Sequence, residues 1–327
     1  MQTTASTSTL HRQWVRQPAR HLRPTDPGQQ QPLRLTTTVP KEFVHRAALA
    51  EVLLSDWDRR GPLHFAVTAQ WPRHHSFFSL TPATHYDPLL AAETIRQSVT
   101  LLSHAELGVP LGYQFLLSEL SVSVQPQHLR IGATPAGIDV DVTFPELRER
   151  RGTPTGGRFE AVLRSGRRVV ATGSGTYTCM NPTVYRRVRG ELSGTVVPLT
   201  APVPPQSVGR MSPMDVVLSP IGEPDRWTLR VDTQHPILFD HPVDHVPGML
   251  LIEAARQAAI SLLGPSFQLP LAIESAFVRY VELDAPCVIE ARRVDSAHGG
   301  TAMQIRGLQG GAEAFLATVT ADPAPLV

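Results

Sequence analysis

The strongest constraint on the fold is an internal repeat. Segments 75–97 and 235–257 share seven identical residues, five of them polar, at a single displacement of 160 positions. Upstream, EVLLS at 51–55 matches DVVLS at 215–219, and a change of loop length accounts for the different offset. So many identities at one offset are hard to obtain by chance, so we expect a duplicated domain. The repeated polar residues are His75, His85, Glu93, Arg96 and Gln97 in the first segment and His235, His245, Glu253, Arg256 and Gln257 in the second.

Each copy is predicted to hold one long helix among about six strands. The helices are expected at 88–107 and 247–263, each with a proline near its first turn. Because both helices are almost entirely apolar, they must be buried, and the sheet should curl around them. Alternating and β-branched runs predict strands at 51–55, 63–71, 113–124, 128–131, 138–144, 159–164 and 169–179, and again at 215–219, 227–233, 273–283, 287–294, 303–308 and 314–321.

Two segments differ in composition from the repeated blocks. Residues 1–38 are rich in Thr, Gln, Pro and Arg and predict a disordered tail, because they bury too little apolar surface to offset their ordering entropy. Residues 181–211 read as a proline-rich, semi-extended linker. The predicted domains are therefore 39–180 and 212–327, in keeping with a length of 327 residues.

Composition excludes several classes of function. The net charge is +1, from 30 basic and 29 acidic side chains, and no helix-turn-helix pattern is present, which argues against a nucleic-acid partner. No apolar run approaches the ~18 residues of a membrane span. The two cysteines, Cys179 and Cys287, match no zinc or redox spacing. The amino terminus lacks the apolar core of a signal peptide, so a cytoplasmic location is expected.

A polar stripe runs along each predicted helix. Glu93, Arg96, Gln97 and Thr100 share one face of the first, and the repeat places Glu253, Arg256 and Gln257 alike on the second. In one interpretation each Glu–Arg pair is structural and pins the two halves together. In the other, the stripe lines a pocket in which a carboxylate takes a proton and a guanidinium holds an anion.

The loops before the two helices carry histidines. His85 and His245 lie just outside the first helical turns, where they are expected to orient a carbonyl or relay a proton. The spacing of His235, His241 and His245 matches no zinc-enzyme pattern, so no metal is predicted. The start of the second helix at Gly248 offers free backbone N–H groups for a thioester carbonyl.

The segment FDHPVDHVPGMLLIEAARQ resembles the active-site segment of the β-hydroxyacyl-carrier-protein dehydratases. This likeness, with one buried helix in a curled antiparallel sheet, implies an α+β hotdog fold in each half, a tandem hotdog. Glu253 falls on the dehydratase glutamate. The loop here is two residues longer, and the dehydratase histidine falls nearest Leu238.

From about Val39 to the C-terminus the chain resembles the A-factor biosynthesis (AfsA-type) family. The motifs that carry the resemblance are VHRAALAEVLLSDW, FAVTAQWPRHHSFF, HYDPLLAAETIRQ, VPLGYQFLL and FDHPVDHVPGMLLIEAARQ. It implies an acyltransferase that joins a β-ketoacyl group from acyl carrier protein to a hydroxyl of dihydroxyacetone phosphate. Formation of that ester is the first committed step toward a γ-butyrolactone, butenolide or furan signal that controls secondary metabolism, including antibiotic biosynthesis.

The resemblance also implies roles for residues. Glu253 or Glu93 takes the proton of the attacking hydroxyl, and Arg256, with Arg96, holds the phosphate. The phosphopantetheine arm of the carrier brings the acyl chain, and no other cofactor is expected. The second half is favoured as the working site because it keeps the Pro-Gly helix start. The remaining substrate-binding candidates are His85, His245, Gly248, Gln97 and Gln257.

Partners and alternatives follow from the same picture. An acidic carrier protein requires a basic patch, for which the candidates are Arg59 with Arg60, 148–151, and 186–189. Two hotdog units in one chain allow a monomer as well as a homodimer. One alternative is a hotdog thioesterase or dehydratase acting on acyl-carrier-protein or CoA thioesters. The other is a non-catalytic regulator that binds an acyl or lactone ligand.

Overall fold

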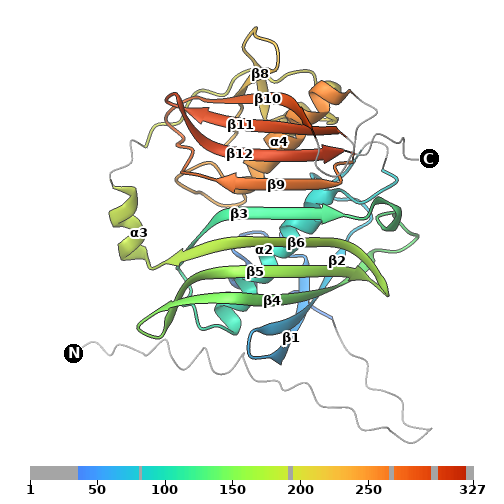
Figure 1. The fold of residues 1–327 in the computed structure, drawn as a ribbon, viewed down its shortest axis with the longest axis vertical. Coiled ribbons are helices and arrows are strands. Elements are labelled where there is room, and N and C mark those ends of the chain that lie inside the picture. Colours follow the sequence, from blue (N-terminus) through green and yellow to red (C-terminus); the bar gives the residue numbers. More distant parts are fainter. Residues whose placement is uncertain (1–35, 81–82, 191–193, 265–268, 296–300, 322–327) are drawn as a thin grey trace, which may run out of the picture. The chain divides into compact units, whose positions relative to one another are not determined.

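A single antiparallel sheet runs through both halves of the chain in a computed structural model (Figure 1), which describes residues 36–80, 83–190, 194–264, 269–295 and 301–321. Within these residues the strand order is β1-β2-β4-β5-β6-β3-β9-β12-β11-β10-β8-β7. The strands are β1 Leu54–Gly61, β2 His64–Trp71, β3 Gln114–Val124, β4 Ala136–Arg150, β5 Thr153–Ser165, β6 Arg168–Met180, β7 Leu218–Pro220, β8 Arg226–Leu229, β9 Ala272–Phe277, β10 Cys287–Asp295, β11 Thr301–Gln309 and β12 Ala312–Ala321.

The order of the strands reflects the duplication. Six strands of the first half are followed by the six corresponding strands of the second half in reverse order, so the sheet has an approximate two-fold axis at its centre. There β3 pairs antiparallel with β9, with Leu120 opposite Ser275. Since every neighbouring pair is hydrogen-bonded, the two halves share one sheet.

Each half has one long helix, and both helices lie on the same face of the sheet (Figure 1). Helix α2 spans Pro88–Ala105, and α4 spans Gly248–Leu263 and ends at Gly264. Most of their residues are buried. Close packing of α2 relies on Gly173 of β6, where an added Cβ would lie only 2.5 Å from Cδ1 of Ile95. This architecture is the tandem hotdog expected from the sequence.

Short helices precede the first strand of each half. In the first half η1 (Lys41–Val44) and η2 (Leu49–Glu51) come before β1. In the second half η4 (Pro205–Val208) and η5 (Pro213–Asp215) come before β7. The repeat therefore begins upstream of the first strand of each half.

Several predicted strands differ at their ends, as where β9 stops at Phe277 and not at 283, and two further segments differ in the type of structure they form. The strand predicted at 128–131 is absent, because that stretch holds the turn η3 (Pro126–His128) and an isolated bridge from Arg130 to His85. The stretch predicted as a semi-extended linker contains α3 (Pro182–Arg189), which starts where the Asn181 side chain accepts a hydrogen bond from Val184 N. The disordered tail predicted at 1–38 lies almost wholly outside the described residues.

Candidate active site

The repeated residues of the first half form a buried network around Glu93. Arg96 donates to both carboxylate oxygens, at 2.8 and 2.7 Å, and Nη2 of Arg46 lies 2.7 Å from Oε1. The amide of Gln97 also donates to Oε1, and it joins the network to the backbone of Glu51 and Leu53. The carboxylate thus faces two guanidiniums and one amide.

The second half repeats this network around Glu253. Arg256 donates to both carboxylate oxygens at 2.9 and 2.7 Å, and Nε of Arg210 donates to Oε1 at 2.8 Å. Gln257 joins the carboxylate to the backbone of Asp215 and Val217. The correspondence includes Arg46 and Arg210, which the sequence prediction did not single out.

Both networks connect the two halves. Nη1 of Arg46 donates to the carbonyl of Ile237 at 2.9 Å, and Nη1 of Arg210 donates to that of Phe77 at 2.5 Å. Each arginine thereby holds the opposite half by its backbone. The expectation that a Glu–Arg pair pins the halves together describes this geometry, and it applies to both copies.

The neighbouring arginines determine the ionisation of Glu93 and Glu253. Burial alone would raise the pKa of Glu93, but Arg46 and Arg96 outweigh burial and hold that pKa below its usual value. For Glu253, Arg210 and Arg256 have the same effect on the pKa. Both carboxylates are therefore ionised, with every oxygen engaged by donors.

A cavity of about 470 Å³ lies between the start of α4 and the middle of α2. This volume falls within the range of small-molecule sites. Charged, polar and apolar side chains all contribute to its wall. The charged and titratable lining comprises His45, Arg46, Arg96, Tyr177, Asp240, His241, His245, Arg279 and Tyr280, and the apolar lining includes Val99, Phe115, Leu120, Phe159, Leu251, Ile252 and Phe277.

The two helix starts differ in their capping. At α2 the carboxylate of Asp87 accepts a hydrogen bond from Leu89 N at 2.9 Å and caps the helix. At α4 the corresponding residue is Pro247, which provides no side-chain cap. Gly248 and Met249 line the cavity, so the uncapped N-terminal turn faces it. An added Cβ at Gly248 would lie 3.2 Å from the ring of Phe277, so a larger residue at this position requires that ring to shift.

The predicted site residues thus separate into three groups. Arg96, His245 and Gly248 line the cavity, with Glu93 and Gln97 directly behind Arg96. His85 lies elsewhere, bridged to Arg130. The second-half residues are fully buried, and none of them is among the residues lining the cavity: they are Glu253, Arg256 and Gln257.

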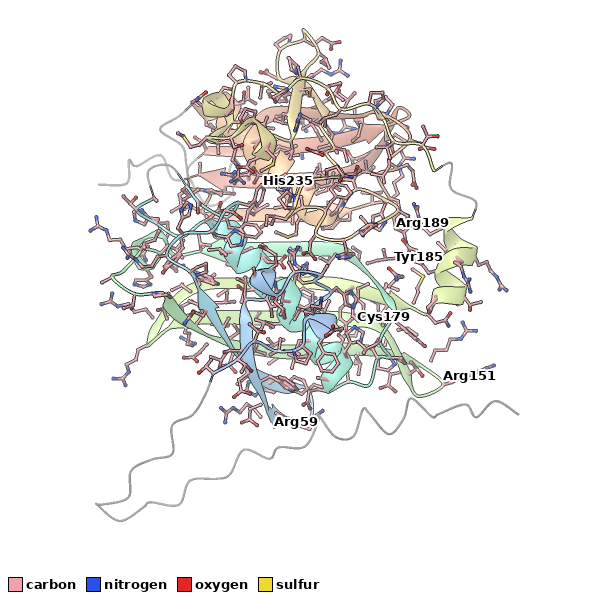
Figure 2. All side chains as sticks on the ribbon, turned by 180° about the vertical axis from the view of Figure 1, so that it is seen from behind. Arg59, Arg151, Cys179, Tyr185, Arg189 and His235 are labelled. Atoms are coloured by element: carbon pink, nitrogen blue, oxygen red, sulfur yellow. The ribbon has the colours of Figure 1, made fainter. Side chains whose placement is uncertain are left out.

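Helix α3 is anchored to the loop before α4 by Tyr185 and Arg189 (Figure 2). Tyr185 donates to Asp244 at 2.7 Å, and Arg189 pairs with both Asp244 and Glu282. Burial acts against ionisation of Asp244, yet these donors and His245 hold its pKa at about 2. Since His245 lines the cavity, α3 is anchored beside this part of the cavity lining.

The cavity residues that the sequence did not single out include His45 and Arg46, whereas Asp240 and His241 belong to the loop already noted for its histidines. A signal for Arg46 was present, because the match at 51–55 and 215–219 continues upstream at the same offset of 164 to Arg46 and Arg210. Within the described ranges, no group of three or more His, Cys, Asp or Glu side chains is arranged to hold a metal. No helix in the described part of the chain has the length and apolarity needed to cross a membrane.

Comparisons with known proteins agree with one another. The profile of the A-factor biosynthesis hotdog domain matches residues 28–181 and 194–322. A Streptomyces virginiae protein named 2-oxo-3-(phosphooxy)propyl 3-oxoalkanoate synthase is 52% identical over 269 residues, covering 81% of this chain and 91% of that protein. One of the same name from Streptomyces coelicolor is 43% identical, covering 86% and 91%. The 12:0-ACP thioesterase from Umbellularia californica shares the fold, with a TM-score of 0.51 and 13% identity over 82% of this chain and 100% of that one.

Proposed function

The chain belongs to the A-factor biosynthesis hotdog family, and on this basis we propose that it is a 2-oxo-3-(phosphooxy)propyl 3-oxoalkanoate synthase. It is an acyltransferase that joins a 3-oxoacyl group to the free hydroxyl of dihydroxyacetone phosphate. The ester formed carries both the acyl chain and the phosphate, and it leads to a γ-butyrolactone, butenolide or furan signal that controls secondary metabolism.

The observation that carries the proposal is the composition of the cavity. Its lining includes guanidiniums, an uncapped helix start and many apolar side chains. These are the three environments that a phosphate, a thioester carbonyl and an alkyl chain require. The working site is then composite, with Arg96 from the first half and Gly248 from the second.

Arg96 is the proposed phosphate ligand. Its Nε and Nη2 are engaged by Glu93 and by the carbonyl of Val44, whereas no described residue accepts a hydrogen bond from Nη1. The side chain is 19% exposed, in contrast to 1% for Arg256. A dianion entering the cavity therefore meets a guanidinium that is fixed in place and still has a donor to offer.

The thioester oxygen is expected at the start of α4. The N–H groups of Gly248 and Met249 belong to the first turn, and the helix dipole adds positive potential there. Charge develops on that oxygen when the hydroxyl attacks, so these donors favour the tetrahedral intermediate over the bound thioester.

Glu93 has a positioning role in this proposal. Because both its oxygens accept hydrogen bonds from Arg96 and it is not among the residues lining the cavity, it is poorly placed to take a proton from substrate. It fixes Arg46 and Arg96 instead. Glu253 fixes Arg210 and Arg256 in the same way in the second network, which is fully buried. The helix start of α2 is capped there by Asp87.

The acyl donor is proposed to be an acyl carrier protein that docks on α3. Arg186 and Arg187 are exposed on this helix, close to Val184 and Val188, which are 41% and 58% exposed. Basic and apolar side chains together suit an acidic helical partner. Arg189 forms ion pairs with Asp244 and Glu282 that hold α3 in place. The exposed side chains of α3 therefore stay close to the cavity. Both halves of the site come from one chain, so a monomer suffices.

The test is incubation with 3-oxoacyl carrier protein in the presence and absence of dihydroxyacetone phosphate. Mass spectrometry is expected to detect the phosphorylated ester, with carrier thiol released only when the phosphate is present. Equal release without dihydroxyacetone phosphate contradicts the transferase and indicates a thioesterase.

A further inference from the structure

His45 adopts a backbone conformation that is unusual for its residue type. It follows η1 with φ 54° and ψ 52°, in the left-handed region. The corresponding residue of the second half is Gly209, which has φ 72° and ψ 23° after η4. Glycine occupies this region without strain, whereas a residue with a Cβ does not. The first half therefore has a histidine at a position where the second half has the unstrained glycine.

The second half holds the segment that carries His45 in place. The carboxylate of Asp240 accepts hydrogen bonds from Ala47 N and Ala48 N, and Arg46 is bound to the carbonyl of Ile237. These contacts over-determine the loop, as a strained residue requires. His45 is consequently fixed against the cavity that it lines.

The tautomer of His45 follows from its neighbours. Nδ1 of His104 lies 2.8 Å from the carbonyl of Val109, which only accepts, so Nδ1 bears the proton. In a neutral His104, Nε2 is then an acceptor, and it accepts a hydrogen bond from Nε2 of His45 at 2.8 Å. The lone pair of His45 accordingly resides on Nδ1, for which no described residue is a hydrogen-bond partner.

We infer that His45 is the general base of the reaction, a role that rests on the proposed function. Nδ1 of His45 takes the proton of the hydroxyl of dihydroxyacetone phosphate as that oxygen bonds to the thioester carbon. The carbon–sulfur bond then breaks, and the leaving thiolate receives the proton from His45. Hydroxyl and thioester become ester and thiol, so atoms and charges balance.

The electrostatic surroundings suit a base that must begin unprotonated. Burial, followed by His104 and Arg96 on α2 and His241 before α4, lowers the pKa of His45 to about 3. The imidazole is thus neutral in the empty site. A phosphate dianion bound by Arg96 offsets the guanidinium charge, so the affinity of His45 for a proton rises when substrate is present.

The experiment replaces His45 with Gly and with Asn, two residues that tolerate the left-handed region. Ester formation and melting temperature are measured for each variant, and imidazole is added to the Gly variant. The matched control is His64→Ala, which removes an exposed histidine of β2 and is expected to behave as the wild type.

We expect both variants to melt at or above the wild-type temperature and to form ester at least about a hundredfold more slowly. Imidazole is expected to restore part of the rate of the Gly variant. Any other result for these variants overturns the role of His45. Absence of ester formation by the wild type overturns the proposed function as well, so the two failures are distinguishable.

Discussion

The two copies of the Glu–Arg network predict unequal costs for the same substitution. Glu253→Gln keeps the shape of the side chain but removes its charge, leaving Arg210 and Arg256 facing each other at 3% and 1% exposure. Removing one partner of a buried ion pair costs about 3–5 kcal/mol. Glu93→Gln should cost less, about 1–2 kcal/mol, because Arg96 reaches the solvent of the cavity.

Thermal unfolding measures this difference. For a folded region of this size about 1 kcal/mol shifts the melting temperature by about 2 °C. Glu253→Gln should therefore lower it by about 6–10 °C and Glu93→Gln by about 2–4 °C. Glu93→Gln should in addition raise the KM for dihydroxyacetone phosphate, since Arg96 loses the carboxylate that orients it.

The control is Glu274→Gln, which neutralises an exposed glutamate of β9 and should leave the melting temperature unchanged. Equal losses of stability for the two network variants would refute the reasoning, because burial would then not distinguish the copies. So would a Glu253→Gln protein that melts normally but has lost turnover, since this pattern indicates direct participation of Glu253 in the chemistry.

Three further predictions concern the helix start, the docking face and acid stability. Pro247→Asp gives α4 the cap that α2 has; it should add about 1 kcal/mol of stability and abolish ester formation, and an active variant would show that the N–H groups are not used. Arg186→Glu with Arg187→Glu should raise the KM for carrier-bound donor and leave turnover of a short pantetheine thioester unchanged; equal effects on both donors would exclude docking on α3. The free energy of unfolding should fall as the pH drops from 6.5 towards 3, because the unfolded chain binds a proton that His45, with its pKa lowered to about 3, does not; urea denaturation of wild type and His45→Gly should show a shallower decline in the variant, and identical declines would contradict this assignment.

Much of the architecture was predictable because repetition and periodicity are local properties. The shared offset of 160 identified two copies, and the apolar runs located both central helices to within two residues. The helix α3 was missed because its apolar content is low and prolines dominate the surrounding stretch. What stabilises it is tertiary, namely the contacts of Arg189 with Asp244 and Glu282.

The residues able to carry chemistry were also visible in the sequence, since ionisable groups on an apolar helix are rare and costly. Which of them reach substrate was decided by the tertiary structure. The open site combines the Glu93 network of one half with the Gly248 helix start of the other, and Asp87 caps the opposite helix. Identical Glu–Arg–Gln motifs thus differ in exposure, because burial depends on segments that are distant in the chain.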